Sequence, residues 1–126
     1  MQLAITRALS FTLPLGVSVN HMYLVTSRGV RLSDDARRFK SDAATIVRNA
    51  AQLIGWLYPP KARLSLSLHL YMPNNRRADV SNLIKATEDA IAAALDFDDQ
   101  YIEEIHARRM GVDRANPRCE VILEVL

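Results

Sequence analysis

PNNRRADVSNLIKATEDAIAAALDFDDQY, residues 73–101, places a basic pair, a carboxylate, a helical pattern and two adjacent carboxylates in close succession. Its apolar residues recur at the spacing of a helix that packs on a core. These residues are Leu83, Ala86, Thr87, Ala90, Ile91, Ala94 and Leu95. Asn82, Lys85 and Asp89 fall together on the other face. The stretch therefore predicts an amphipathic helix with a polar face.

Carboxylates lie on either side of this predicted helix. Asp79 comes just before it, and Asp98 and Asp99 come shortly after it. Adjacent carboxylates repel each other and are better tolerated beside a cation; Mg²⁺ is commonly held by one or two carboxylates, water and substrate phosphate. Lys85 would add a fixed positive charge for a phosphate in its transition state. The residues alone leave two interpretations open: a metal-phosphate site, or a helix N-capped by Asp79 and followed by an acidic turn.

Two short elements carry a family resemblance. D-x-S-N-x-x-K covers residues 79–85, and D-D-x-x-I covers residues 98–102, with the helix between them. Together they resemble the core signature of the RusA-type Holliday junction resolvases, a resemblance that covers nearly the whole chain. Members of that family are small, homodimeric, Mg²⁺-dependent endonucleases of largely phage origin that cut four-way DNA junctions.

The resemblance implies a role for each matching residue. Asp79 and Asp99 match metal-binding aspartates that also serve catalysis, and Asp98 matches their acidic neighbour. Lys85 matches the catalytic lysine. Asn82 matches the asparagine next to the site. The implied cofactor is Mg²⁺, with Mn²⁺ as a substitute.

One departure from the family pattern concerns the metal. Ser81 stands where the best-known members have a further metal-binding aspartate, although serine also fits this position in the family. The site then has one fewer negative charge, so the departure affects the expected metal affinity more than the fold. Ala78, where a basic residue is often found, is a lesser departure.

Arginines carry most of the positive charge. The net charge is only +2, which by itself does not indicate a nucleic-acid partner, but its distribution is uneven. The planar guanidinium group of arginine can donate two hydrogen bonds to one phosphate. We expect six arginines to bind the DNA backbone, with ordinary surface charge as the alternative: Arg28, Arg31, Arg76, Arg77, Arg108 and Arg109. Along the helix predicted after Ser33, Arg37, Arg38, Lys40 and Arg48 are expected to be mostly solvated.

Length and composition limit the classes of protein. We expect the 126 residues to form a single domain, with no second one. The sequence has no apolar run long enough for a membrane span and no signal-peptide pattern, so a cytoplasmic protein is expected. The lone cysteine, Cys119, is expected in a strand rather than as a nucleophile.

Periodicity predicts an α/β (α+β) fold: a single-layer, mixed and mostly antiparallel sheet covered by two helices. Alternating residues predict strands over 3–13, 64–71, 101–110 and 117–126, and a hairpin over 22–32. Ser33 begins the longest helical pattern, which Gly55 ends.

The functional hypothesis is a Mg²⁺-dependent endonuclease that resolves four-way DNA junctions by paired nicks in recombination and repair. A homodimer follows from the resemblance, and it suits a substrate of approximate two-fold symmetry. Two alternatives remain: a DNA-junction-binding module whose metal site has degraded, and another metal-dependent phosphohydrolase that acts on nucleotides.

Overall fold

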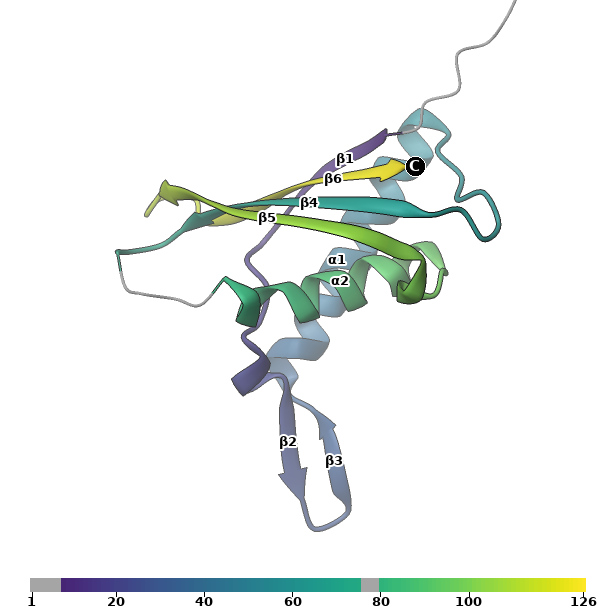
Figure 1. Cartoon of the computed structure of the whole chain (residues 1–126). Helices are drawn as coiled ribbons and strands as arrows, with labels where there is room; N and C mark the ends of the chain where they lie inside the picture. The colour runs from purple at the N-terminus through teal and green to yellow at the C-terminus, as the bar shows by residue number, and fades with distance from the viewer. Residues whose placement is uncertain (1–7, 76–79) are drawn as a thin grey trace, which may run out of the picture.

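Alternating apolar and polar residues form a four-stranded sheet in the computed structural model, which describes residues 8–75 and 80–126 (Figure 1). The strand order is β1-β6-β4-β5. The strands are β1 (Ala8–Leu13), β4 (Leu64–Met72), β5 (Ile102–Val112) and β6 (Arg118–Val125). β6 pairs antiparallel with both β1 and β4, whereas β4 and β5 are parallel. Parallel neighbours need a crossover connection, and the segment between β4 and β5 supplies it with a helix.

Two helices cover one face of the sheet (Figure 1). In α1 (Asp34–Ile54), the Ser33 hydroxyl accepts a hydrogen bond from the Ala36 N–H at 3.1 Å, and Gly55 ends the helix with a φ of 67°. Both ends therefore have the capping chemistry that the sequence predicts. The second helix, α2 (Ser81–Leu95), is the crossover between β4 and β5.

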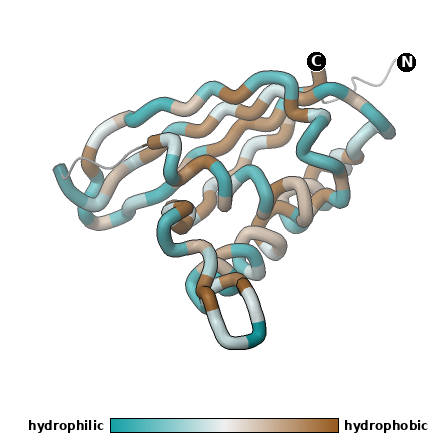
Figure 2. Tube along the Cα trace, turned by 60° about the horizontal axis from the view of Figure 1, so that its bottom comes forward, coloured by the Kyte–Doolittle hydropathy of each residue, from teal (hydrophilic) through white to brown (hydrophobic). Residues whose placement is uncertain are grey.

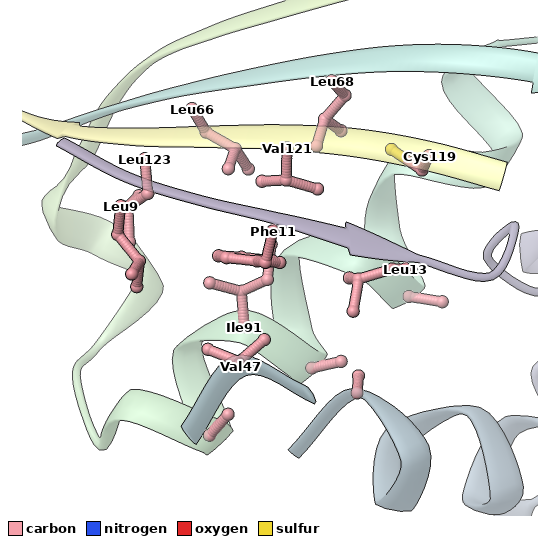
Figure 3. Close-up of a cluster of buried hydrophobic side chains, with 14 of the residues drawn as sticks. Leu9, Phe11, Leu13, Val47, Leu66, Leu68, Ile91, Cys119, Val121 and Leu123 are labelled. Carbon is pink, nitrogen blue, oxygen red and sulfur yellow. The ribbon is translucent and has the colours of Figure 1, made fainter. Parts of the chain in front are cut away.

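The core lies between the sheet and the helices (Figure 3). Every second residue of β4 and β6 points into it, which is the period of a strand with one buried face. The helices contribute the apolar residues at helical spacing, among them Val47 of α1 and Ile91 of α2, neither of which has any exposed surface. Cys119 is buried in β6. Burial raises the pKa of its thiol to about 12, so it is a packing residue, as expected.

A two-stranded hairpin projects beyond the helices, away from the sheet (Figure 1). A short 3₁₀ helix, η1 (Val19–His21), leads into β2 (Tyr23–Thr26), which pairs with β3 (Gly29–Leu32). The hairpin residues are mostly exposed, including Val25 at 86%. Figure 2 shows that hydrophobic residues occur along this projecting hairpin. The Ser33 hydroxyl donates to the His21 carbonyl at 2.7 Å, which ties the hairpin base to the start of α1.

The predicted fold class is confirmed. The sheet is mixed and mostly antiparallel, and two helices cover it. The predicted strand over 3–13 is described from Ala8 onward, because residues 1–7 lie outside the described residues. In the described part of the chain, no helix is both long enough and apolar enough to cross a membrane.

Candidate active site

A tight reversal of the chain after α2 builds the candidate site. Asp96 has a φ of 56°, in the left-handed region that aspartate tolerates better than most residues, and its N–H donates to carbonyls of the last helical turn. The Phe97 N–H donates to the Ala92 carbonyl at 3.0 Å, and the Phe97 ring packs against Tyr58 with centroids 5.0 Å apart. The reversal turns the following residues back along the outer face of α2.

The reversal brings Asp99 to Lys85, ten residues before the end of α2. The Lys85 Nζ lies 3.8 Å from the Asp99 Oδ2 and 3.0 Å from the Asp89 Oδ1. The hydrogen bond and charge of Asp89, and then the charge of Asp99, raise the pKa of Lys85 above its ordinary value. The ammonium group is therefore charged at neutral pH and half-exposed, so a substrate phosphate can reach it.

Glu88 is an acidic neighbour of the site that the sequence analysis did not select. Burial, and then the charge of Asp99, raise the pKa of its carboxyl group. A signal did exist, because Glu88 lies three residues after Lys85 and so falls near it on a helix. Its proximity to Asp99, however, depends on the reversal at Asp96, which periodicity does not reveal.

Asp98 and Asp99 have different surroundings although they are adjacent. Asp98 caps the short 3₁₀ helix η2 (Asp99–Tyr101): its Oδ1 accepts from the Gln100 backbone N–H at 3.0 Å, and its Oδ2 accepts from the Gln100 side-chain amide at 3.1 Å. Asp99 makes the longer ion pair with Lys85. The acidic turn predicted from the sequence thus presents one carboxylate bound locally and one directed to the lysine.

A groove of about 450 Å³ adjoins these residues. Asp89 and Asp99 line its polar side, and alanines of α2 together with Phe39 of α1 line its apolar side. Tyr23 and Leu32, at the base of the hairpin, also line it. The groove therefore connects the candidate site to the projecting hairpin. Lys40 also borders it and is exposed, as expected from the sequence.

The first turn of α2 holds the two supporting residues. Ser81 is exposed at the first position of the helix, and Asn82 follows it, half-buried. They lie four and three residues before Lys85, so both fall on its side of the helix. Val80 occupies the N-cap position and makes no side-chain capping bond. Asp79, for which an N-cap and a metal-binding role were both considered, lies outside the described residues, as do Arg76 and Arg77.

The described arginines divide into separate groups. Arg28 and Arg31 are exposed on the hairpin. Arg108 and Arg109 are exposed on β5, where they pair in register with His69 and Leu70 of β4. Successive strand residues point to opposite faces, and Leu70 is in the core. Arg109 therefore lies on the face covered by the helices and Arg108 on the opposite face, so the two cannot contact one DNA backbone from the same face.

The basic residues of α1 behave differently from one another. Arg37 and Arg38 pair with Asp34 and Asp35 in the first turns of the helix, as solvated surface charges. Arg48 is not only solvated: its Nε donates to the Ala94 carbonyl of α2 at 3.1 Å. This hydrogen bond fastens the end of α2 to α1 just before the reversal.

The donor set near Lys85 suits a hard cation. Asp99 supplies carboxylate oxygen, and its contact with Lys85 is longer than a direct hydrogen bond, which leaves oxygen lone pairs for another partner. Among residues 8–75 and 80–126, no group of three or more acidic, histidine or cysteine side chains could hold a metal ion. The oxygen chemistry fits Mg²⁺, and the proposed ligand set includes Asp79, outside those ranges.

Comparison with known proteins places this architecture in a family. The family model of the endodeoxyribonuclease RusA matches residues 14–124. The chain is 31% identical over 106 residues to the crossover junction endodeoxyribonuclease RusA of Escherichia coli strain K12, covering 83% of this chain and 85% of the relative. It is 29% identical over 104 residues to the protein of the same name from Enterobacteria phage 82, covering 82% and 83%. The chain belongs to the RusA family of endodeoxyribonucleases.

Proposed function

We propose that this chain is a Mg²⁺-dependent endonuclease that resolves four-way DNA junctions by paired nicks, acting as a homodimer. The observation that carries the proposal is the contact between Lys85 and Asp99, because it joins the two signature elements of the family in one place. The curated relatives are named crossover junction endodeoxyribonucleases, which supports the choice of substrate. A two-fold symmetric dimer would present one site to each of two strands of like polarity.

The proposed ligands of the metal are Asp79, Asp98 and Asp99. When bound, Mg²⁺ supplies polarisation of a phosphoryl oxygen and acidification of a water molecule. Lys85 keeps its proton at neutral pH, so its ammonium group is available to offset the negative charge that develops on the scissile phosphate. Asp99 orients Lys85 before the substrate binds, and Ser81 and Asn82 complete the polar edge of the site on the first turn of α2.

A four-way junction assembled from synthetic oligonucleotides tests the proposal directly. With Mg²⁺ we expect two symmetric nicks in strands of like polarity, seen as shorter strands on a denaturing gel. With a chelator we expect binding alone, seen as a band of lower mobility on a native gel, and no product. A shifted band without product in Mg²⁺ as well would instead identify a binding module. Equal cleavage of a linear duplex, or strong competition by nucleoside triphosphates, would indicate a different phosphohydrolase.

Asp99→Asn tests the proposed ligand role. The substitution removes a negative charge near the DNA, so we expect nicking to be lost while junction binding is kept or improved. Loss of binding together with cleavage would show that Asp99 has a structural role instead. Unfolding curves of both proteins control for a change in stability.

The hairpin would position the DNA through its phosphates. Arg28 lies in the turn of the hairpin. We expect Arg28→Ala to weaken the binding of all junction sequences about equally. The slope of log affinity against log salt concentration should become shallower by about one, the value for one lost phosphate contact. Arg63, just before β4 and paired with Glu103 at 3.6 Å, offers a matched control. Equal effects of Arg28→Ala and Arg63→Ala would contradict a specific role for the hairpin.

A further inference from the structure

Asp89 contacts the Lys85 ammonium group more closely than Asp99 does. Its Oδ1 accepts a hydrogen bond from the Lys85 Nζ at 3.0 Å, whereas the Asp99 Oδ2 is 3.8 Å away. The Asp89 side chain is 35% exposed and borders the same groove as Asp99. Lys85 is thus held between one carboxylate of its own helix and one carboxylate of the returning chain.

Helix stability does not account for the Lys85–Asp89 pair. A pair four residues apart stabilises a helix best when the acidic residue precedes the basic one, and here the lysine comes first. Lys85 is the fifth residue of α2, past the first turn, so the helix dipole does not explain the pair either. This orientation stabilises the helix less than the reverse order would, so we look for a different role for Asp89.

Positioning is that different role. A lysine side chain has several rotatable bonds, so fixing it in one position costs rotamer entropy. An ammonium group has three donors, so one hydrogen bond to Asp89 leaves two for Asp99 and a phosphate oxygen. Asp89 is itself on a rigid support, because its neighbour Ala90 is buried in the core.

We propose that Asp89 is a positioning residue that holds the Lys85 ammonium group at a fixed place beside Asp99, ready for the scissile phosphate. The inference rests on the proposed nuclease function of the same site. Without Asp89, the Lys85 ammonium group keeps only the longer contact with Asp99 and is no longer held at one place. Asp89 acts through Lys85 and does not itself contact the substrate.

Asp89→Ala is the first test, with Asp42→Ala as the matched control. Asp42 is an exposed acid on α1, so the control makes the same change of charge and of helix propensity away from the site. For Asp89→Ala we expect kcat on the junction to fall about 10- to 100-fold, as for a misplaced catalytic group, with junction affinity unchanged or higher. Asp89→Glu keeps a carboxylate and should recover most of the rate. Full kcat in Asp89→Ala would overturn the proposal.

A double substitution tests whether Asp89 acts through Lys85. If it does, adding Asp89→Ala to Lys85→Ala causes no further loss of cleavage, because the group that Asp89 positions is already gone. A further loss equal to that of the single substitution would show that Asp89 acts independently, and would overturn the positioning role. The two effects are compared as ratios of single-turnover rates.

A measurement without DNA separates this inference from the proposed function. The chain has three lysines, Lys40, Lys61 and Lys85, so the ammonium ¹⁵N signals can be assigned by substitution. We expect the Lys85 ammonium signal to be observable in the wild type and in Asp42→Ala, and to broaden in Asp89→Ala. An unchanged Lys85 signal in Asp89→Ala would overturn the inference. A wild-type protein that does not cut junctions would overturn the proposed function instead, and leave the NMR result as the test of the contact.

Discussion

The two helices both carry ion pairs on their outer faces, but the pairs differ in orientation and reach. On α1, Asp34 and Asp35 precede Arg37 and Arg38 in the first turns, and all four side chains are more than half exposed. On α2, Lys85 precedes its acidic partner and also contacts Asp99, which belongs to a separate element. The first arrangement stabilises a helix locally. The second joins α2 to the following element, a contact that the stability of the helix alone does not require.

The largest expected difference between the two helices is in catalysis. Lys85→Ala should reduce junction cleavage about 100- to 1000-fold, the usual cost of removing one group that stabilises transition-state charge. Arg37→Ala removes a cation from the equivalent region of α1 and should leave the rate unchanged. Single-turnover cleavage of both variants checks the comparison. Near-wild-type turnover in Lys85→Ala would remove Lys85 from the mechanism.

A smaller effect, on stability, is expected where the loop after β1 packs against α2 at Gly16. A Cβ added at Gly16 would lie 2.7 Å from the Thr87 Oγ1 and 2.9 Å from the Leu83 carbonyl oxygen, on the α2 turns that flank Lys85. Gly16→Ala must therefore displace the loop or the helix, and we expect a loss of about 1–3 kcal/mol in the free energy of unfolding, as for overpacking of a core.

Reaction of Cys119 with a thiol reagent in increasing denaturant measures that loss, because this thiol is buried in the fold. Gly29→Ala, on the hairpin, is a poor control because its φ of 111° adds backbone strain. Gly16→Ser is a better comparison, since it places the same Cβ with one more atom. Stability equal to the wild type in both variants would show that the contact with α2 is loose.

The exposed pairs of α1 should have the smallest effect on stability. Asp34→Ala removes the partner of Arg37, and the pKa of Asp34 is lowered chiefly by that arginine. Solvent screens exposed ion pairs, so we expect only a small decrease in the free energy of unfolding and no change in cleavage. Reduced cleavage at unchanged stability would contradict the division between the helices.

The protonation state of Lys85 should not change near neutral pH. The folded chain holds this proton more tightly than the unfolded chain, because the pKa of Lys85 is raised. The associated stability is fully present below the ordinary lysine pKa and is lost only as pH rises through the higher folded value. Between pH 7 and about pH 9, the cleavage rate should therefore show no decrease from deprotonation of Lys85. A decrease that Lys85→Ala abolishes would show that the pKa is not raised.

Periodicity and capping chemistry predict most of the fold. The helix from Ser33 to Gly55, the alternation along β4 and the hairpin over 22–32 follow from local sequence, because burial imposes periods of 3.6 and 2 on the residues. The parallel pairing of β4 and β5 does not follow, since strand order depends on contacts between distant segments. The opposite faces of Arg108 and Arg109 were predictable from adjacency alone, although the sequence analysis grouped these residues as one DNA-binding set.

The candidate site is only partly predictable for the same reason. The signature elements select Lys85 and Asp99, and the structure brings these two together. Glu88 was not selected, and Asp89 was recognised only as part of the polar face. Their place beside Asp99 depends on the left-handed conformation of Asp96, which aspartate adopts more readily than most residues but which local periodicity does not predict.

The parallel pairing of β4 with β5 has a consequence for the order of folding. The hairpin closes across two residues, but β5 can join β4 only after the chain has crossed the whole of α2 and turned at Asp96. Contacts between segments so distant in sequence are entropically costly and tend to form slowly. Lys85 and Asp99 lie on this crossover, so a chain in which β5 has not yet joined β4 would not hold the two side chains together.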